Sequence, residues 1–181
     1  MKVLLVNGSP HPEGHTAGAL REVESVLREK GLETEWFQLA NKPVRGCIGC
    51  ESCRNSYRCI FNDDQANELI DRIVAADGVV IGSPVYFAGP NGALLALLDR
   101  VFYAGSCQGR LFRGKAGAAV VTLWRAGSTA ALDRLNKYFA YSEMPIVSSD
   151  YWNMLHHGRD SYGVAIMRTL GSNMADLLSQ P

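Results

Sequence analysis

Four cysteines of this chain fall within thirteen residues, at the spacing Cys47-x2-Cys50-x2-Cys53-x5-Cys59. A C-x2-C-x2-C run is typical of a 4Fe–4S cluster, because successive thiolates can reach different irons of one cube. Zinc sites usually pair two C-x2-C units at longer separation. The spacing therefore favours a cluster held by these four thiols, with a zinc ion or free thiols as the alternatives. Cys107 stands alone in a glycine-rich stretch, and we expect it to take no part.

A second group of polar residues follows the first apolar run, residues 2–7, which is long enough for one strand. A strand, a loop of small residues and a helix N-terminus together present free backbone N–H groups to an anion. The spacing Gly8-x5-Gly14-His15-Thr16 has one residue too many for a nucleoside-triphosphatase P-loop and lacks its lysine, and no G-x-G-x-x-G motif is present. We predict a site for one terminal phosphate rather than an ordinary strand–helix connection. Its expected ligands are Ser9, His11, Gly14, His15 and Thr16.

Residues 83–89, Ser-Pro-Val-Tyr-Phe-Ala-Gly, combine a stiff backbone with two adjacent aromatic side chains. Rigid amides beside an aromatic wall suit a flat heterocycle with polar edges, and flavin is such a ring. The residues expected to hold the ring are Pro84, Val85, Tyr86, Phe87, Ala88 and Gly89. Residues 124–128, which include Gly127, are expected to complete the flavin edge. The alternatives are that the two aromatics fill the core and that residues 124–128 only start a helix.

These segments need a scaffold, and the hydrophobic pattern predicts one. Strands are predicted at residues 2–7, 32–39, 77–83, 116–123 and 145–150, and helices at 16–30, 66–74, 91–103, 129–141 and 164–178. Alternating strands and helices indicate a doubly wound α/β fold with helices on both faces of a parallel sheet. Ligands of such sheets bind beyond the carboxyl ends of the strands. The loops 8–16, 84–90 and 124–128 and the cysteine loop 40–62 are all expected at this edge, in a single domain spanning residues 1–181.

Composition narrows the class of protein. The chain is 47% hydrophobic and 20% charged, which is ordinary for a globular protein. Lysine plus arginine equals aspartate plus glutamate, at 18 each, so charge gives no reason to expect nucleic acid or an anionic membrane as partner. No apolar run is long enough for a transmembrane helix, and the N-terminus begins directly with a strand. A cytoplasmic location is therefore expected.

Other polar pairs have simpler interpretations. The histidine pair at residues 156–157 has no third ligand at useful spacing and is predicted to be an exposed loop pair. Asp99-Arg100 lies in a helix and is predicted to form surface or interface ion pairs. The acidic pair at residues 63–64 is predicted to cap a helix. No side-chain catalytic group is predicted, because hydride and electron transfer are the flavin's own chemistry.

The segments GSPHPEGHT and GSPVYFAGPNGALLALLDR, at residues 8–16 and 82–100, together resemble the NAD(P)H-dependent FMN reductase branch of the flavodoxin-like flavoproteins. The cysteine motif resembles that of the iron–sulfur flavoproteins, a sister group. The resemblance covers nearly the whole chain and weakens after residue 145. It implies a flavodoxin-like five-stranded parallel sheet of order 2-1-3-4-5, with FMN held by residues 9–16 and 84–89.

The resemblance also implies a function. The expected protein is an FMN-dependent oxidoreductase that passes reducing equivalents from NAD(P)H through FMN to a flavin, a quinone or another small acceptor. The four-cysteine motif adds a 4Fe–4S cluster to this expectation. The alternatives are an electron carrier that takes electrons from a ferredoxin-like partner and a regulatory module that has lost its cofactor. Relatives of this kind are usually dimers or tetramers, so a homodimer or homotetramer is expected.

Overall fold

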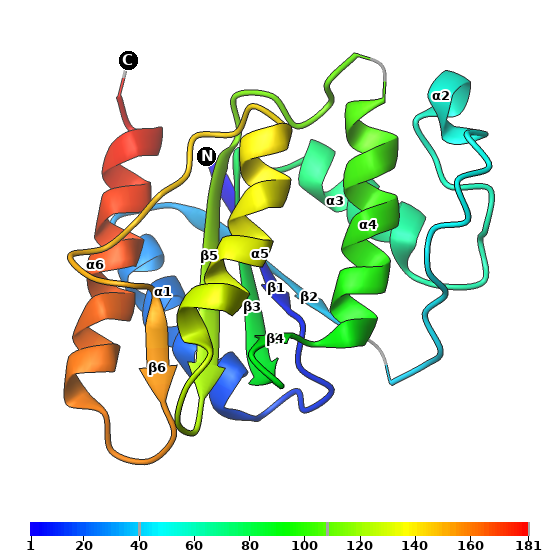
Figure 1. Cartoon of the computed structure of the whole chain (residues 1–181). Coiled ribbons are helices and arrows are strands. Elements are labelled where there is room, and N and C mark those ends of the chain that lie inside the picture. The colour runs from blue at the N-terminus through cyan, green and yellow to red at the C-terminus, as the bar shows by residue number, and fades with distance from the viewer. Residues whose placement is uncertain (40, 108, 181) are drawn as a thin grey trace.

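A computed structural model describes residues 1–39, 41–107 and 109–180 of the chain (Figure 1). Its strands are β1 Lys2–Asn7, β2 Glu33–Gln38, β3 Gly78–Tyr86, β4 Gly89–Pro90, β5 Ala116–Leu123 and β6 Met154–His156. Its helices are α1 His15–Glu29, α2 Cys53–Ser56, α3 Ala66–Val74, α4 Gly92–Ser106, α5 Ser128–Tyr141 and α6 Ser161–Leu178. None of the helices in this part of the chain combines the length and apolarity needed to cross a bilayer.

The main strands form a parallel sheet in the order β2-β1-β3-β5-β6, and the two-residue strand β4 pairs antiparallel with β3. The predicted α/β architecture with a parallel sheet is thus confirmed. The predicted five-stranded sheet of order 2-1-3-4-5 needs correction, because the described residues form six strands. Residues 84–90, predicted as a loop, contain the end of β3 and a tight hairpin to β4.

The outer strand of the sheet was predicted in the wrong place. Residues 145–150 form only a single bridge to β5, between Ile146 and Gly117, and the edge strand is β6, where no strand or helix was predicted. The buried Asn153 explains the difference. Its side-chain oxygen accepts hydrogen bonds from the backbone N–H and the hydroxyl of Ser149, and its amide donates to the carbonyl of Val147. This network turns the chain, and pairing with β5 resumes at Asn153, whose carbonyl accepts from the Val121 N–H at 3.0 Å.

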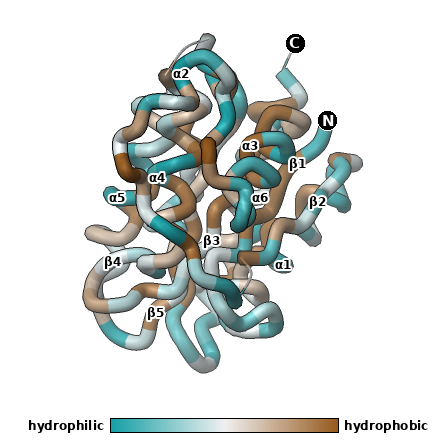
Figure 2. Tube along the Cα trace, turned by 90° about the vertical axis from the view of Figure 1, so that its right-hand side faces the viewer, coloured by the Kyte–Doolittle hydropathy of each residue, from teal (hydrophilic) through white to brown (hydrophobic). Residues whose placement is uncertain are grey.

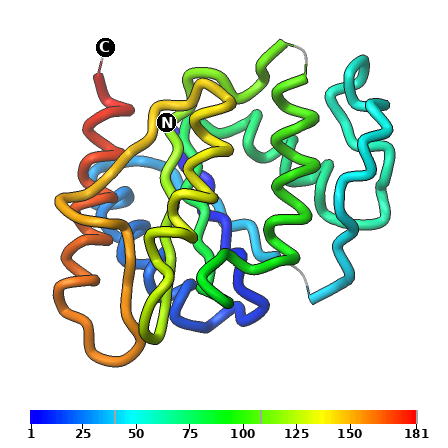
Figure 3. The backbone as a smooth tube through the Cα atoms, in the orientation of Figure 1, coloured from blue at the N-terminus to red at the C-terminus, as the bar shows by residue number. Residues whose placement is uncertain are grey.

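The sheet is buried on both faces because its strands are apolar at successive positions. In β1, Leu4 and Val6 face α3, α4 and α5, whereas Val3 and Leu5 face α1 and α6. Figures 1 and 3 show these two helical layers on opposite sides of the sheet. In Figure 2 the hydrophobic stretches gather along the central strands and the hydrophilic ones along the outer loops. This partition leaves the loops at the carboxyl ends of the strands free to build a site.

The cysteine loop does not stay at that edge, contrary to the sequence-based expectation. After β2 it runs along the outer flank of α4 toward the opposite end of the molecule, where α2 lies (Figures 1 and 3). One contact at this end of the molecule comes from the thiol of Cys107, at the C-terminal end of α4, which donates to the carbonyl of Cys53 at 3.4 Å. The cysteines therefore lie beside α4, away from the loops that follow β1, β3 and β5.

Candidate functional site

A cavity of about 260 Å³ opens where β1, β3, β5 and β6 end. The loops after these strands supply its walls: Ser9, His11, Gly14, His15, Thr16, Pro84, Val85, Tyr86, Thr122, Leu123, Trp124 and His157. The predicted phosphate residues all line it, and so do the first three of the predicted ring residues. Phe87, Ala88, Gly89 and Gly127 are not part of the lining.

The loop after β1 is held in place by a buried amide, Asn7. Its nitrogen donates to the Gln38 side-chain oxygen at 2.7 Å, and its oxygen accepts from the Ser9 N–H at 3.1 Å. The Gln38 amide in turn donates to the Ser9 carbonyl at 2.7 Å. The Ser9 hydroxyl oxygen accepts from the His11 N–H at 3.1 Å, which leaves the hydroxyl proton available for an acceptor in the cavity. The loop is thus fixed by the protein itself before any ligand binds.

Helix α1 begins at the cavity with its N-terminus uncapped. Gly14 occupies the N-cap, no side chain of the described residues caps it, and the first turn contains no acidic residue. The first backbone N–H groups of a helix lack intrahelical partners and carry a partial positive charge. The hydroxyls of Thr16 and Thr122 lie 2.8 Å apart at the same wall. Because only one of them donates in that bond, the other keeps a proton for a ligand. This wall of the cavity suits an anion.

The hairpin between β3 and β4 forms the facing side. Tyr86 pairs with Gly89, so Phe87 and Ala88 make a two-residue turn, with φ of 49° and 59°. Positive φ at both positions is what a type I′ hairpin turn requires, and it is uncommon outside glycine and asparagine. The Phe87 ring is fully exposed and Tyr86 is half exposed. The alternative that these aromatics fill the core is therefore wrong.

Gly127 does not line the cavity but packs against the hairpin that forms one of its walls. Its φ is +94°, and a Cβ there would lie 2.6 Å from Ala88 Cα. Only a glycine lets the chain after β5 pack so closely against the hairpin. Gly127 is also the N-cap residue of α5, so this segment both supports the hairpin and starts a helix.

His157 lines the cavity, although the histidine pair at residues 156–157 was predicted only to be an exposed loop pair. Its ring stacks on Trp124 at 3.7 Å between centroids with 13° between the planes, and it contacts the His15 ring at 4.0 Å. His157 and Trp124 come from the loops after β6 and β5, and His15 is the first residue of α1. Their joint position follows from β6 being the edge strand, because residue 157 then lies at its carboxyl end. The sequence carried this signal only weakly, since the edge strand was predicted at residues 145–150.

A second hollow lies beside α4, and it brings the four motif cysteines together. Cys47, Cys50, Cys53 and Cys59 all line it, together with Arg100 and Tyr103 among others, and none of its residues lines the first cavity. Among residues 1–39, 41–107 and 109–180, no three Cys, His, Asp or Glu side chains converge closely enough to hold a metal ion. The free space is about 20 Å³, about that of one water, so a cluster requires the exposed loop to move outward. The donor set itself, four thiols, is the one that a 4Fe–4S cluster uses.

The thiols of the hollow differ in their surroundings. Hydrogen bonds from Ser52 lower the pKa of the exposed Cys50 thiol. Burial, followed by the neighbouring Cys107 thiol, raises the pKa of Cys53 to about 11. Cys107 is thus in contact with the motif, although its isolated place in the chain predicts no part for it.

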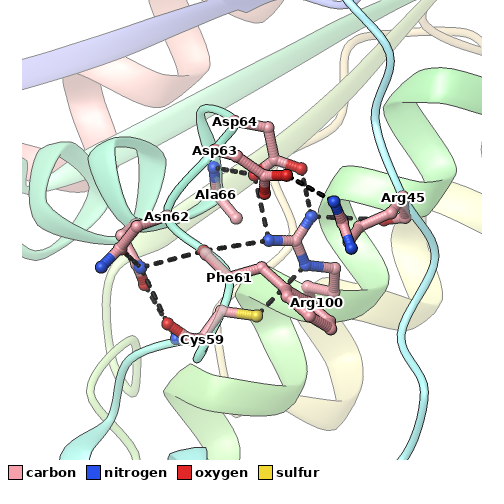
Figure 4. Close-up of polar contacts among 9 residues, drawn as sticks. Arg45, Cys59, Phe61, Asn62, Asp63, Asp64, Ala66 and Arg100 are labelled. Atoms are coloured by element: carbon pink, nitrogen blue, oxygen red, sulfur yellow. Dashed lines mark hydrogen bonds and ion pairs between the residues drawn. The ribbon is translucent and has the colours of Figure 1, made fainter.

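Arg100 ties the cysteine loop to α4 (Figure 4), and the prediction that it forms a surface pair is wrong. It is 2% exposed, and its guanidinium makes a bidentate ion pair with the buried Asp64. The N-cap residue of α3 is Gln65 and not one of the two predicted aspartates, although Asp64 accepts from the N–H of the first helical residue, Ala66, at 3.1 Å. Asp99 does form the predicted surface pair, with Arg134 at 2.8 Å.

A doubly wound parallel sheet with an anion-suited loop at its carboxyl edge defines an α/β protein of the flavodoxin-like type. A flavodoxin from the domain Archaea superposes with a TM-score of 0.69 at 14% identity, covering 99% of this chain and 100% of that one. An NADH:FMN oxidoreductase in its apo form superposes with a TM-score of 0.72 at 15% identity, covering 99% and 91%. Likeness at these identities establishes the fold.

The chain belongs to the NADPH-dependent FMN reductase family, which matches residues 1–158. This is a family of FMN-binding flavoprotein oxidoreductases. An iron-sulfur flavoprotein of Methanocaldococcus jannaschii is 33% identical to the chain, and the match covers 98% of this chain and 97% of that protein.

Proposed function

We propose that this protein binds FMN in the cavity at the carboxyl edge of the sheet and passes reducing equivalents from NAD(P)H to a flavin, a quinone or another small acceptor. The observation that supports this most is the cavity itself. One wall offers the uncapped N-terminus of α1 with serine and threonine hydroxyls, and the other offers the stiff β3–β4 hairpin. A phosphate and a planar ring joined by a short chain match these two walls. Family membership supports the same cofactor.

Each wall has its own task in this proposal. The backbone and side chains of Ser9, His11, Gly14, His15 and Thr16 would hold the phosphate. Pro84, Val85 and Tyr86 would contact the ring, and Phe87, Ala88, Gly89 and Gly127 would keep the hairpin in shape. Bound FMN would supply the hydride and electron chemistry. The chain's own contribution is to bind and orient the cofactor.

We also propose that Cys47, Cys50, Cys53 and Cys59 hold a 4Fe–4S cluster. The shared hollow, the C-x2-C-x2-C spacing and the name of the M. jannaschii relative support this. The spacing also favours a cluster over zinc, because zinc sites usually pair two C-x2-C units at longer separation.

One anaerobic preparation tests both cofactors. The visible spectrum, an FMN titration and an assay for iron and sulfide should show one FMN and one 4Fe–4S cluster per chain. A Cys50→Ser variant should lose the iron and keep FMN, whereas Cys107→Ser, which lies outside the motif and keeps a hydrogen-bond donor for the Cys53 carbonyl, should keep both. A protein that binds neither flavin nor iron would contradict the proposal.

Stopped-flow reduction tests the electron donor. Anaerobic mixing with NADPH or NADH should bleach the flavin absorbance. Flavin that is bleached by a reduced ferredoxin and by neither nucleotide would instead assign the protein to the electron carriers.

A further inference from the structure

Within the described part of the chain, the hydrogen bonds of the Arg100 guanidinium all go to the loop that carries the cysteines (Figure 4). Besides its pair with Asp64, it donates to the carbonyls of Arg45 at 3.2 Å and Phe61 at 3.4 Å. Its Nε–H donates to the sulfur of Cys59 at 3.2 Å. The Arg100 and Asp64 side chains are 1% and 5% exposed, so these bonds form away from water. A buried charge of this kind is expensive to keep unless its partners are well placed.

Most of this network has a purely structural explanation. The bonds to Asp64 and to the two carbonyls fasten a loop without regular structure to the flank of α4. The bond to sulfur is different, because a thiol is a weak acceptor and adds little to such a fastening. A thiolate ligated to iron is a much better acceptor for a charged donor. The Nε–H of Arg100 is therefore aimed at the one atom in the network whose charge would change with a cluster's oxidation state.

We propose that Arg100 is a positioning residue for the cluster: it fixes Cys59 as a ligand and favours the reduced state of the cluster through its N–H···S bond. This inference rests on the proposed cluster. One-electron reduction adds one negative charge to the iron and sulfur atoms. Hydrogen bonds to the ligand sulfurs and nearby positive charge stabilise that charge and raise the reduction potential. Asp64 acts in the opposite direction, because its carboxylate offsets part of the guanidinium charge.

The opposite signs of Arg100 and Asp64 give the test its design. The full-length protein, purified anaerobically with its cofactors, is compared with R100Q, R100K and D64N by redox titration followed by visible and EPR spectra. In R100Q we expect the reduction equilibrium constant of the cluster to fall at least tenfold, which is about 59 mV for one electron. R100K keeps a charge but loses the planar fork, so its cluster potential should also fall. D64N should shift the potential upward, because asparagine retains the acceptor oxygen and removes the negative charge.

A matched control separates this effect from charge in general. Arg54 lies next to Cys53 in the same loop, but its side chain is half exposed and pairs with Glu51. R54Q removes one positive charge near the cluster, where water and salt screen it, and should leave the potential unchanged. The FMN content and potential serve as an internal control, since the flavin cavity shares no lining residue with the cysteine hollow.

Each outcome decides one of the two proposals. A wild-type protein that contains FMN but no iron or sulfide overturns the cluster and, with it, the role of Arg100. A wild-type protein with a cluster whose potential is the same in R100Q and R100K overturns only the role of Arg100. Variants that keep FMN but lose iron support the positioning role. If neither Arg100 variant folds, the direction of the shift in D64N decides: an upward shift supports the inference, and no shift refutes it.

Discussion

Replacing Gly8 by alanine should destabilise this protein. A Cβ at this position would lie 2.4 Å from a methyl carbon of the fully buried Leu94 and 2.8 Å from the carbonyl oxygen of Gly82. Forcing a methyl group into a packed core costs about 1–3 kcal/mol. The N–H of Gly8 also donates to that same carbonyl at 2.8 Å, and losing the bond would cost about 1 kcal/mol more. We expect a total loss of about 2–4 kcal/mol.

Thermal unfolding followed by circular dichroism measures the effect. About 2–4 kcal/mol lowers the Tm of a protein of this size by roughly 4–16 °C. Gly18→Ala is the matched control, because Gly18 lies within α1 and has no atom within 4 Å of the added Cβ. It should raise stability by about 0.5–1 kcal/mol, since alanine is the better helix former. A Gly8→Ala protein that melts at or above the wild-type temperature, or two alanine variants that shift alike, would refute the reasoning.

Three further predictions concern other parts of the molecule. A hydrogen bond from Lys2 is the main cause that lowers the pKa of Glu35 from 4.5. The ionised carboxylate therefore stabilises the folded protein above that pH, and this stabilisation is lost as the pH falls through the lowered pKa. Glu35→Gln should cost at most about 1 kcal/mol at pH 7 in urea unfolding, and the difference should shrink in acid; a constant difference contradicts this. Phe87→Asn should stabilise the hairpin by about 0.5–1 kcal/mol, because asparagine accepts a positive φ more readily; a lower Tm would count against turn strain. Thr16→Val should leave the Thr122 hydroxyl without its partner and weaken FMN binding about tenfold, measured by quenching of flavin fluorescence, and unchanged affinity would remove Thr16 from the site.

The parts of the fold that local patterns determine were predictable. Residues 2–7 are apolar at successive positions, which identified a buried strand, and the small polar residues after it identified a loop at the carboxyl edge. Asn91 was placed correctly as the start of α4, where its side chain accepts from the N–H groups of Ala93 and Leu94. Such signals lie within a few residues of the structure they predict, so contacts between distant segments do not override them.

The errors arose where the contacts of buried side chains determine the structure. Residues 145–150 look more like a strand than Met154–His156 does, and only the buried side chain of Asn153 reverses that choice. Arg100 carries no mark of burial in the sequence, because the loop that covers it has no periodicity and its partner Asp64 is 36 residues away. The position of His157 depended on the same edge strand. For Arg100 the missing information is a side-chain contact between segments far apart in sequence, whereas for the edge strand it is the burial of Asn153, whose partners lie only four and six residues away.

The course of the cysteine loop along the flank of α4 has a consequence for how this protein can be re-engineered. The segment enters after β2 and leaves before α3, and Arg100 and Cys107 of α4 fasten it to the body. Cys53 belongs to the hydrophobic core, and Val44 and Cys59 pack against that core. A cysteine-free replacement of this segment therefore has to supply apolar side chains at these positions, together with an apolar residue at position 100, if the protein is to remain folded as a plain flavin-binding scaffold.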